Sequence, residues 1–152
     1  FYAGTAFNII PEFSVFGGTV RTHNEEVRRS MPDKMEKIIK GITEAFGCKY
    51  EFKYDYGIAG VYNNPDTVDR FMESAARVLG ADYVTSLTEP VMSSEDFSEY
   101  SSRIEKSAAF SIGTTDIGEP EYPLHNEKYN FNNKTLPYGI AAMAQYVLDI
   151  NK

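Results

Sequence analysis

The first sixty residues carry three segments with a strand-type pattern. Residues 3–10 and 13–21 are β-type runs that meet at Pro11. Residues 48–56 alternate aromatic or apolar side chains with charged ones, which is typical of a half-exposed strand. We therefore expect two strands before, and one strand after, the segment that separates them.

A helix-type pattern fills the space between these strands. Apolar residues recur every three or four positions from Val27 to Phe46, as on one face of an amphipathic helix. Asn24 is placed to cap this helix and Gly47 to end it, while Pro32 predicts a kink or a fresh start. The order strand, strand, helix, strand predicts an α+β two-layer sandwich.

A change of composition marks the middle of the chain. Residues 57–64 are rich in glycine and asparagine and read as a loop, so we place a domain boundary there, between residues 1–60 and 61–152. Asn64 and Pro65 then have the types expected for the cap and the first position of a new helix.

The second half predicts a mixture of short elements. Residues 93–100 resemble a short helix capped by one of the two serines that begin it. Residues 108–112 predict a buried strand, and residues 136–148 a final helix. Between them, residues 113–133 form a long polar segment, and loops of that length in compact domains are often functional.

Composition narrows the class of protein. The 152 residues are 42% apolar and 24% charged, which is ordinary for a globular domain. The formal charge of −7 argues against binding to nucleic acid or to an anionic membrane surface. Cys48 is the only cysteine, so no internal disulfide forms and a reducing, cytoplasmic setting is expected. The chain begins inside a strand-type run at Phe1, so we expect further polypeptide before it.

Two groups of residues in the second half are candidates for metal chemistry. His125 lies in the long loop after a predicted strand, and neutral imidazole is the commonest metal-binding group. A loop histidine that bonds a neighbouring carbonyl is, on this evidence alone, the commoner case. Glu95 and Asp96, at a predicted helix start, either orient a metal ligand or simply compensate the helix dipole.

Two polar residues in the first half are candidates for substrate binding. Asn8 and Arg21 each lie in a strand-type run close to glycine or proline. A guanidinium is a planar fork that suits a carboxylate, although an edge arginine paired with a surface glutamate is an equally simple interpretation.

Seven segments together resemble one protein family. In chain order they are residues 4–11 (GTAFNIIP), 18–22 (GTVRT), 63–65 (NNP), 90–97 (PVMSSEDF), 110–113 (FSIG), 123–131 (PLHNEKYNF) and 136–139 (LPYG). Their order and spacing across nearly the whole chain resemble the aminoacylase/carboxypeptidase-type metallo-amidohydrolases, the group that contains hippurate hydrolase and N-acyl-amino-acid amidohydrolases.

The resemblance implies a division of the fold. Residues 1–60 would be the later part of a ferredoxin-like lid, or dimerisation, domain. Residues 61–152 would be the C-terminal part of an α/β zinc-peptidase-like catalytic domain. The implied partners are the missing N-terminal half of the enzyme and a second copy that pairs through the lid domain.

The resemblance also implies site residues and a reaction. His125 would be a metal ligand, and Asn8 and Arg21 would contact the substrate from the lid. The reaction would be hydrolysis of the amide bond of an N-acyl amino acid or small peptide by metal-activated water. Two divalent ions (zinc, or manganese, nickel or cobalt) would bind. Their other ligands and the general-base glutamate would lie in the N-terminal half, so this chain alone would be inactive.

A different class of function is also open. The first sixty residues alone fit a non-catalytic ferredoxin-like module that binds a small ligand or mediates dimerisation. That alternative does not explain the second half with its long loop around His125.

Overall fold

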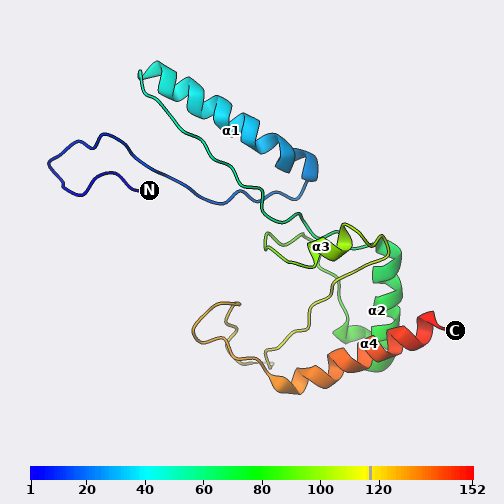
Figure 1. Ribbon diagram of the computed structural model, residues 1–152. Coiled ribbons are helices and arrows are strands. Elements are labelled where there is room, and N and C mark those ends of the chain that lie inside the picture. Colours follow the sequence, from blue (N-terminus) through cyan, green and yellow to red (C-terminus); the bar gives the residue numbers. More distant parts are fainter. Residues whose placement is uncertain (117) are drawn as a thin grey trace. The chain divides into compact units, whose positions relative to one another are not determined.

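The computed structural model describes residues 1–116 and 118–152, and its regular structure is helical (Figure 1). The chain divides into two compact units, residues 1–57 and residues 58–152, which are described separately below. Residue 117, which falls in the long loop predicted for residues 113–133, lies outside the described residues.

The first unit is built around one long helix, α1 (Glu25–Ala45). Asn24 caps it as predicted, because its side-chain oxygen accepts a hydrogen bond from the backbone N–H of Val27 at 3.0 Å. The helix continues through Pro32, so no fresh start occurs there. None of its residues is buried, and Phe46 at its C-terminal end is 80% exposed.

The predicted α+β ferredoxin-like lid is wrong for this chain. Among the described residues, strand-type pairing is limited to one isolated antiparallel bridge between Tyr2 and Val15. The segment after α1 runs back along the helix instead of pairing with another strand (Figure 1). Its Tyr50 hydroxyl contacts the Glu36 carboxylate at 3.2 Å.

The physical reason is that the alternation of apolar and charged residues determines which side chains share a face of a strand. It does not provide a second strand for pairing. Tyr50 and Tyr56 of this segment hydrogen-bond to α1 instead of lying in a strand that pairs with another strand. The ferredoxin-like binding module, proposed above as an alternative, required the sheet that the described residues do not form.

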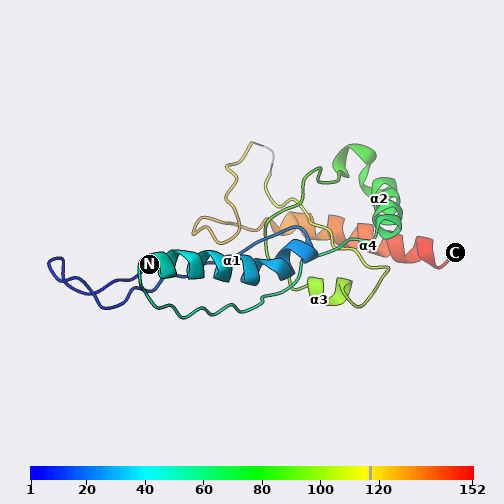
Figure 2. The same cartoon turned by 90° about the horizontal axis from the view of Figure 1, so that it is seen from above.

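The second unit is held by two crossing helices, α2 (Pro65–Leu79) and α4 (Leu136–Ile150), which lie side by side in both views (Figures 1 and 2). Ala75 and Ala142 form the small buried apolar centre, at 2% and 3% exposure. Phe71 stacks on Phe110 with ring centroids 4.3 Å apart and meets Tyr146 edge-on at 5.7 Å. Small residues at the crossing let the helices approach while the aromatic rings cover its side.

One carboxylate joins the two helices by hydrogen bonds. Asp149 of α4 accepts from the buried Ser74 hydroxyl at 2.8 Å and from the Arg77 guanidinium at 2.7 Å, both on α2. Gln145 and Lys152 donate to its other oxygen. The hydrogen bonds from Lys152, Ser74 and Gln145, with the charge of Arg77, hold the pKa of Asp149 far below its ordinary value.

The start of α2 agrees with its predicted cap. The Asn64 side chain accepts from the backbone N–H of Thr67 at 3.1 Å, and Pro65 is the first helical residue. Within the described part of the chain, no helix combines the length and apolarity needed to cross a membrane.

The α/β fold predicted for residues 61–152 is also wrong, because the described residues of the second unit form no sheet, and two of the shorter elements differ from the prediction. The helix expected over residues 93–100 is only α3 (Ser98–Ser101), so neither predicted serine cap exists. The strand expected at residues 108–112 is absent, and the Asn63 side chain bonds the Ala109 N–H at 2.8 Å where a partner strand would. Two short 3-10 helices, η1 (Ala81–Tyr83) and η2 (Asn133–Thr135), complete the second unit.

Candidate active site

His125 lies in a loop made of two consecutive turns. In the first turn, the Asn126 N–H donates to the Pro123 carbonyl at 3.1 Å. In the second, the Tyr129 N–H donates to the Asn126 carbonyl at 3.0 Å. The Asn126 side-chain oxygen also accepts from the Lys128 N–H at 2.8 Å. The loop therefore has a defined backbone path around the histidine.

The backbone of His125 is strained. Its φ of 70° lies in the left-handed region, and no other non-glycine residue among those described has a positive φ. A side chain in this region costs about 1–2 kcal/mol. His125 is the third residue of its turn, a position where glycine or asparagine is favoured when φ is positive.

The imidazole of His125 is open to binding. The residue is exposed, and within the described residues its side chain makes no hydrogen bond or ion pair. The interpretation of His125 as a loop histidine that bonds a neighbouring carbonyl therefore finds no contact in the structure. Neutral imidazole is a good ligand for zinc and similar divalent ions.

Side chains anchor the ends of this loop. The hydroxyl of the half-buried Tyr129 lies 3.4 Å from the Thr114 hydroxyl. The Lys128 ammonium lies 5.9 Å from the centre of the Tyr122 ring, within cation–π range. The same region lines a polar hollow of about 590 Å³, beside which Asn132 donates to Asp116 at 2.8 Å.

Glu95 and Asp96 precede α3 and are both exposed. A Glu95 carboxylate oxygen accepts from the Phe97 N–H at 3.2 Å, and its carbonyl accepts from the Ser98 N–H. The Asp96 carbonyl accepts from the Glu99 N–H at 3.0 Å. These contacts are those of a local turn, and the orienting role predicted for the two carboxylates stays a prediction.

The described residues do not complete a metal site. Nowhere in residues 1–116 or 118–152 do three His, Cys, Asp or Glu side chains gather as ligands for one ion. His125 fits one position of a metal site, since it offers a single unbonded imidazole, and any further ligands would have to come from other polypeptide.

The two predicted substrate contacts belong to the first unit. Asn8 lies in a turn of the loop that is closed by the backbone pair of Tyr2 and Val15, with N···O distances of 2.7 and 2.8 Å. Arg21 precedes Thr22, whose hydroxyl donates to the Asn24 carbonyl at 3.1 Å at the start of α1. Both Asn8 and Arg21 are exposed.

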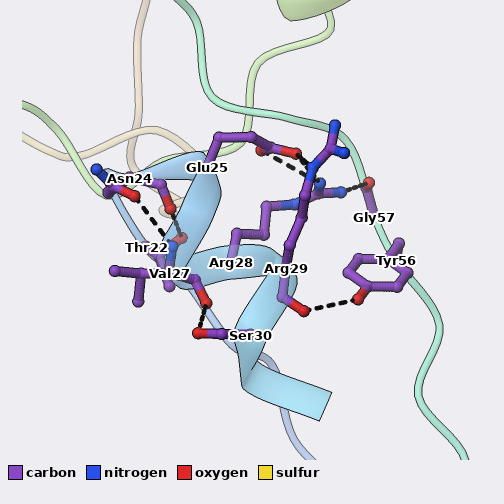
Figure 3. A network of polar contacts seen from close by, with 9 residues as sticks. All are labelled: Thr22, Asn24, Glu25, Val27, Arg28, Arg29, Ser30, Tyr56 and Gly57. Atoms are coloured by element: carbon purple, nitrogen blue, oxygen red, sulfur yellow. Dashed lines mark hydrogen bonds and ion pairs between the residues drawn. The ribbon is translucent and has the colours of Figure 1, made fainter. Parts of the chain in front are cut away.

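A polar network fixes the start of α1 (Figure 3). Glu25 accepts hydrogen bonds from Arg29 at 2.9 Å and from Arg28 at 3.1 Å, and the Arg29 hydrogen bond is the largest cause that lowers the Glu25 pKa. Arg28 also donates to the Gly57 carbonyl and lies over the Tyr56 ring. The Tyr56 hydroxyl donates to the Arg29 carbonyl at 3.1 Å. The network therefore ties the chain that follows Arg21 to residues 56 and 57.

Sequence reasoning missed Asn126. An asparagine that follows a proline-containing turn often bonds the backbone two residues further on, so the signal was present in the sequence.

Comparisons with known proteins agree on one family. The model of peptidase family M20/M25/M40 matches residues 6–149. The hippurate hydrolase of Campylobacter jejuni is 32% identical over 97% of this chain and 37% of its own length. The N-acetylcysteine deacetylase of Bacillus subtilis is 34% identical over 82% of the chain and 33% of its own length.

A shorter match has higher identity. The N-acyl-L-amino acid amidohydrolase of Geobacillus stearothermophilus is 54% identical over 41% of this chain and 17% of its own length. No solved structure matches the chain. The chain spans about a third of the length of the first two relatives named above.

Proposed function

The chain belongs to peptidase family M20/M25/M40, and from that premise we propose that it is part of a metal-dependent hydrolase of N-acyl amino acids or small peptides. Two relatives are named for the hydrolysis of hippurate and the deacetylation of N-acetylcysteine, and both of these substrates are N-acyl amino acids. The shared chemistry is the basis for this substrate class.

The observation that carries the proposal is the conformation of His125. An exposed histidine sits in a left-handed backbone position with no hydrogen bond to its imidazole among the described residues. Strained positions of this kind persist where the surroundings over-determine them, and they cluster at functional sites. A glycine would remove the strain, so a role for the imidazole itself explains why a histidine occupies the turn.

Each proposed residue then has one task. His125 would coordinate one of two divalent ions through a ring nitrogen. Two such ions, when bound, supply an activated water and polarise the scissile carbonyl. Arg21 holds the free carboxylate of the amino-acid part through a charge-assisted, bidentate contact. Asn8 donates its amide N–H to the substrate carbonyl oxygen as that oxygen gains negative charge. Glu95 and Asp96 would accept hydrogen bonds from ligands of the metal and orient them.

The active site would be shared between this chain and further polypeptide. The general base and the remaining metal ligands would belong to the polypeptide that completes the enzyme, and the first unit would also pair with a second copy. Exposed apolar residues on α4 fit a helix that needs further cover: Ile140 is 68% and Leu148 is 62% exposed. "Intact protein" below means this chain together with the polypeptide that completes it.

The experiment is a hydrolysis assay on the intact protein with hippurate, N-acetyl-L-methionine and a dipeptide. We expect turnover that is lost with a chelator, is restored by zinc or manganese, and is absent in His125→Ala. His23→Ala, which removes the other histidine, is the matched control and should stay active. Full turnover of His125→Ala would contradict the role of His125, and turnover that withstands complete metal removal would contradict metal dependence.

A further inference from the structure

Asn126 follows His125 directly and bonds both turns of the loop at once. Its N–H closes the first turn on the Pro123 carbonyl, and its carbonyl closes the second on the Tyr129 N–H. Its side-chain oxygen caps the second turn at the Lys128 N–H, 2.8 Å away. These three contacts use a backbone donor, a backbone acceptor and a side-chain acceptor of one residue.

We infer that Asn126 is a positioning residue that holds His125 in its left-handed conformation and so directs the imidazole toward the metal. This inference rests on the proposed function. A histidine at φ 70° is strained and relaxes to a negative φ unless its neighbours prevent it. The residue after it can prevent this, because rotation at His125 would carry the Asn126 N–H away from the Pro123 carbonyl.

The side chain of Asn126 makes this restraint stronger than a backbone turn alone. Its bond to the Lys128 N–H is an Asx turn, which fixes the backbone direction after Asn126. Tyr129 then extends the restraint to the start of the long loop, since it is half-buried and its hydroxyl lies 3.4 Å from the Thr114 hydroxyl. His125 is thereby held from its C-terminal side by a series of contacts that reaches Thr114.

The restraint has a specific chemical requirement. The residue at position 126 must present a side-chain oxygen to a backbone N–H two residues ahead, which asparagine and aspartate do and alanine does not. The loop also supplies a matched control in Asn130. It has the same side chain, is exposed, and makes no side-chain hydrogen bond among the residues that the structure describes.

The test compares four variants of the intact protein: Asn126→Ala, Asn126→Asp, Asn130→Ala and His125→Ala. The readouts are the zinc dissociation constant and the visible spectrum of the cobalt-loaded protein. Loss of a group that orients a metal ligand typically weakens metal binding by about 10–100-fold. We expect a loss in this range for Asn126→Ala with a changed cobalt spectrum, near-complete retention for Asn126→Asp, and no change for Asn130→Ala.

The outcomes separate the two proposals. A large loss of zinc affinity in His125→Ala, with an unchanged affinity and spectrum in Asn126→Ala, would overturn the positioning role alone. Unchanged affinity in both would overturn the metal-ligand role of His125 and the inference that rests on it. An equal loss in Asn126→Asp and Asn126→Ala would show that the side-chain oxygen is not what matters, and would also overturn the inference.

A measurement without metal tests the loop itself. Amide hydrogen exchange at Tyr129 and Lys128 reports opening of the second turn. Asn126→Ala should raise the exchange rates of these amides by about threefold to tenfold. This ratio corresponds to the net free energy of one hydrogen bond. Adding His125→Gly should restore slow exchange at Tyr129, whose N–H still has the Asn126 carbonyl as its acceptor, because glycine removes the strain that favours opening. Failure of the glycine to restore it would refute the claim that Asn126 opposes strain at residue 125.

Discussion

The contact between Gly139 and Ile112 gives a stability prediction whose size depends on the residue at position 112. Gly139 is buried in α4, and a Cβ added there would meet the Cδ1 atom of Ile112 well inside contact distance, with Cγ1 at 3.5 Å. Ile112 lies two residues before Thr114, which contacts Tyr129 of the His125 loop. The packing of Gly139 therefore bears on the segment that anchors the candidate site.

Two opposing contributions set the change in the free energy of unfolding caused by Gly139→Ala. Replacing glycine by alanine inside a helix contributes about 1 kcal/mol of stability. Inserting a methyl group into an occupied space costs about 1–3 kcal/mol. Because Ile112 is 40% exposed and Cδ1 is the free end of its side chain, the clash costs the low end of that range, and the net effect is about zero. Ile112→Val deletes the clashing atom, so Gly139→Ala in that background should instead stabilise by about 1 kcal/mol.

The assay is urea unfolding of the wild type, both single variants and the double variant, followed by helical circular dichroism. Ile112→Val alone should cost about 0.5 kcal/mol, the low end for such a change, because Ile112 is 40% exposed. The coupling between the two positions should then be about 1 kcal/mol. If Gly139→Ala has the same effect in both backgrounds, within about 0.5 kcal/mol, the described contact does not govern this helix and the reasoning fails.

Two further predictions concern charge. Asp149→Asn should lower the urea midpoint at neutral pH, while Asp69→Asn, an exposed change on α2, should not. Because the folded-state pKa of Asp149 is depressed, its contribution is present above the ordinary value of 3.8 and is lost as pH falls below it. The midpoints of wild type and Asp149→Asn should therefore converge in acid, and a constant gap would contradict this. Arg21→Ala should raise KM or lower kcat for N-acyl amino acids far more than for their carboxamides, and equal effects on both substrates would refute the carboxylate contact.

Local signals in the sequence predicted α1, α2 and α4 well. Asn24 and Asn64 cap α1 and α2 as expected, because an N-cap depends on a side chain and a backbone N–H three residues apart. The final helix also appears where its apolar period placed it. These features need no distant partner, so the sequence of a few residues determines them.

The predicted strands are absent from the described residues because a strand, unlike a helix cap, needs a partner from elsewhere in the chain. Alternation over residues 48–56 predicts a face, but a sheet exists only where another strand supplies the hydrogen-bonding partner. Here Tyr50 and Tyr56 bond to α1, and the Asn63 side chain pairs with Ala109. The identity of these partners depends on chain far away in the sequence, which periodicity does not encode.

The candidate site was predicted residue by residue, but its geometry was not. His125, Asn8 and Arg21 came from motifs that resemble a family. Neither the left-handed backbone of His125 nor the double turn centred on Asn126 follows from those motifs. Backbone strain is a property of the folded loop, and it became visible only in the structure.

The most direct test of the account is the zinc affinity of the intact protein in two single-histidine variants. The account predicts that His125→Ala weakens zinc binding strongly and lowers the bound zinc per chain, while His23→Ala binds zinc like the wild type. Equal zinc content and equal dissociation constants in all three proteins would contradict the assignment of His125 as a metal ligand.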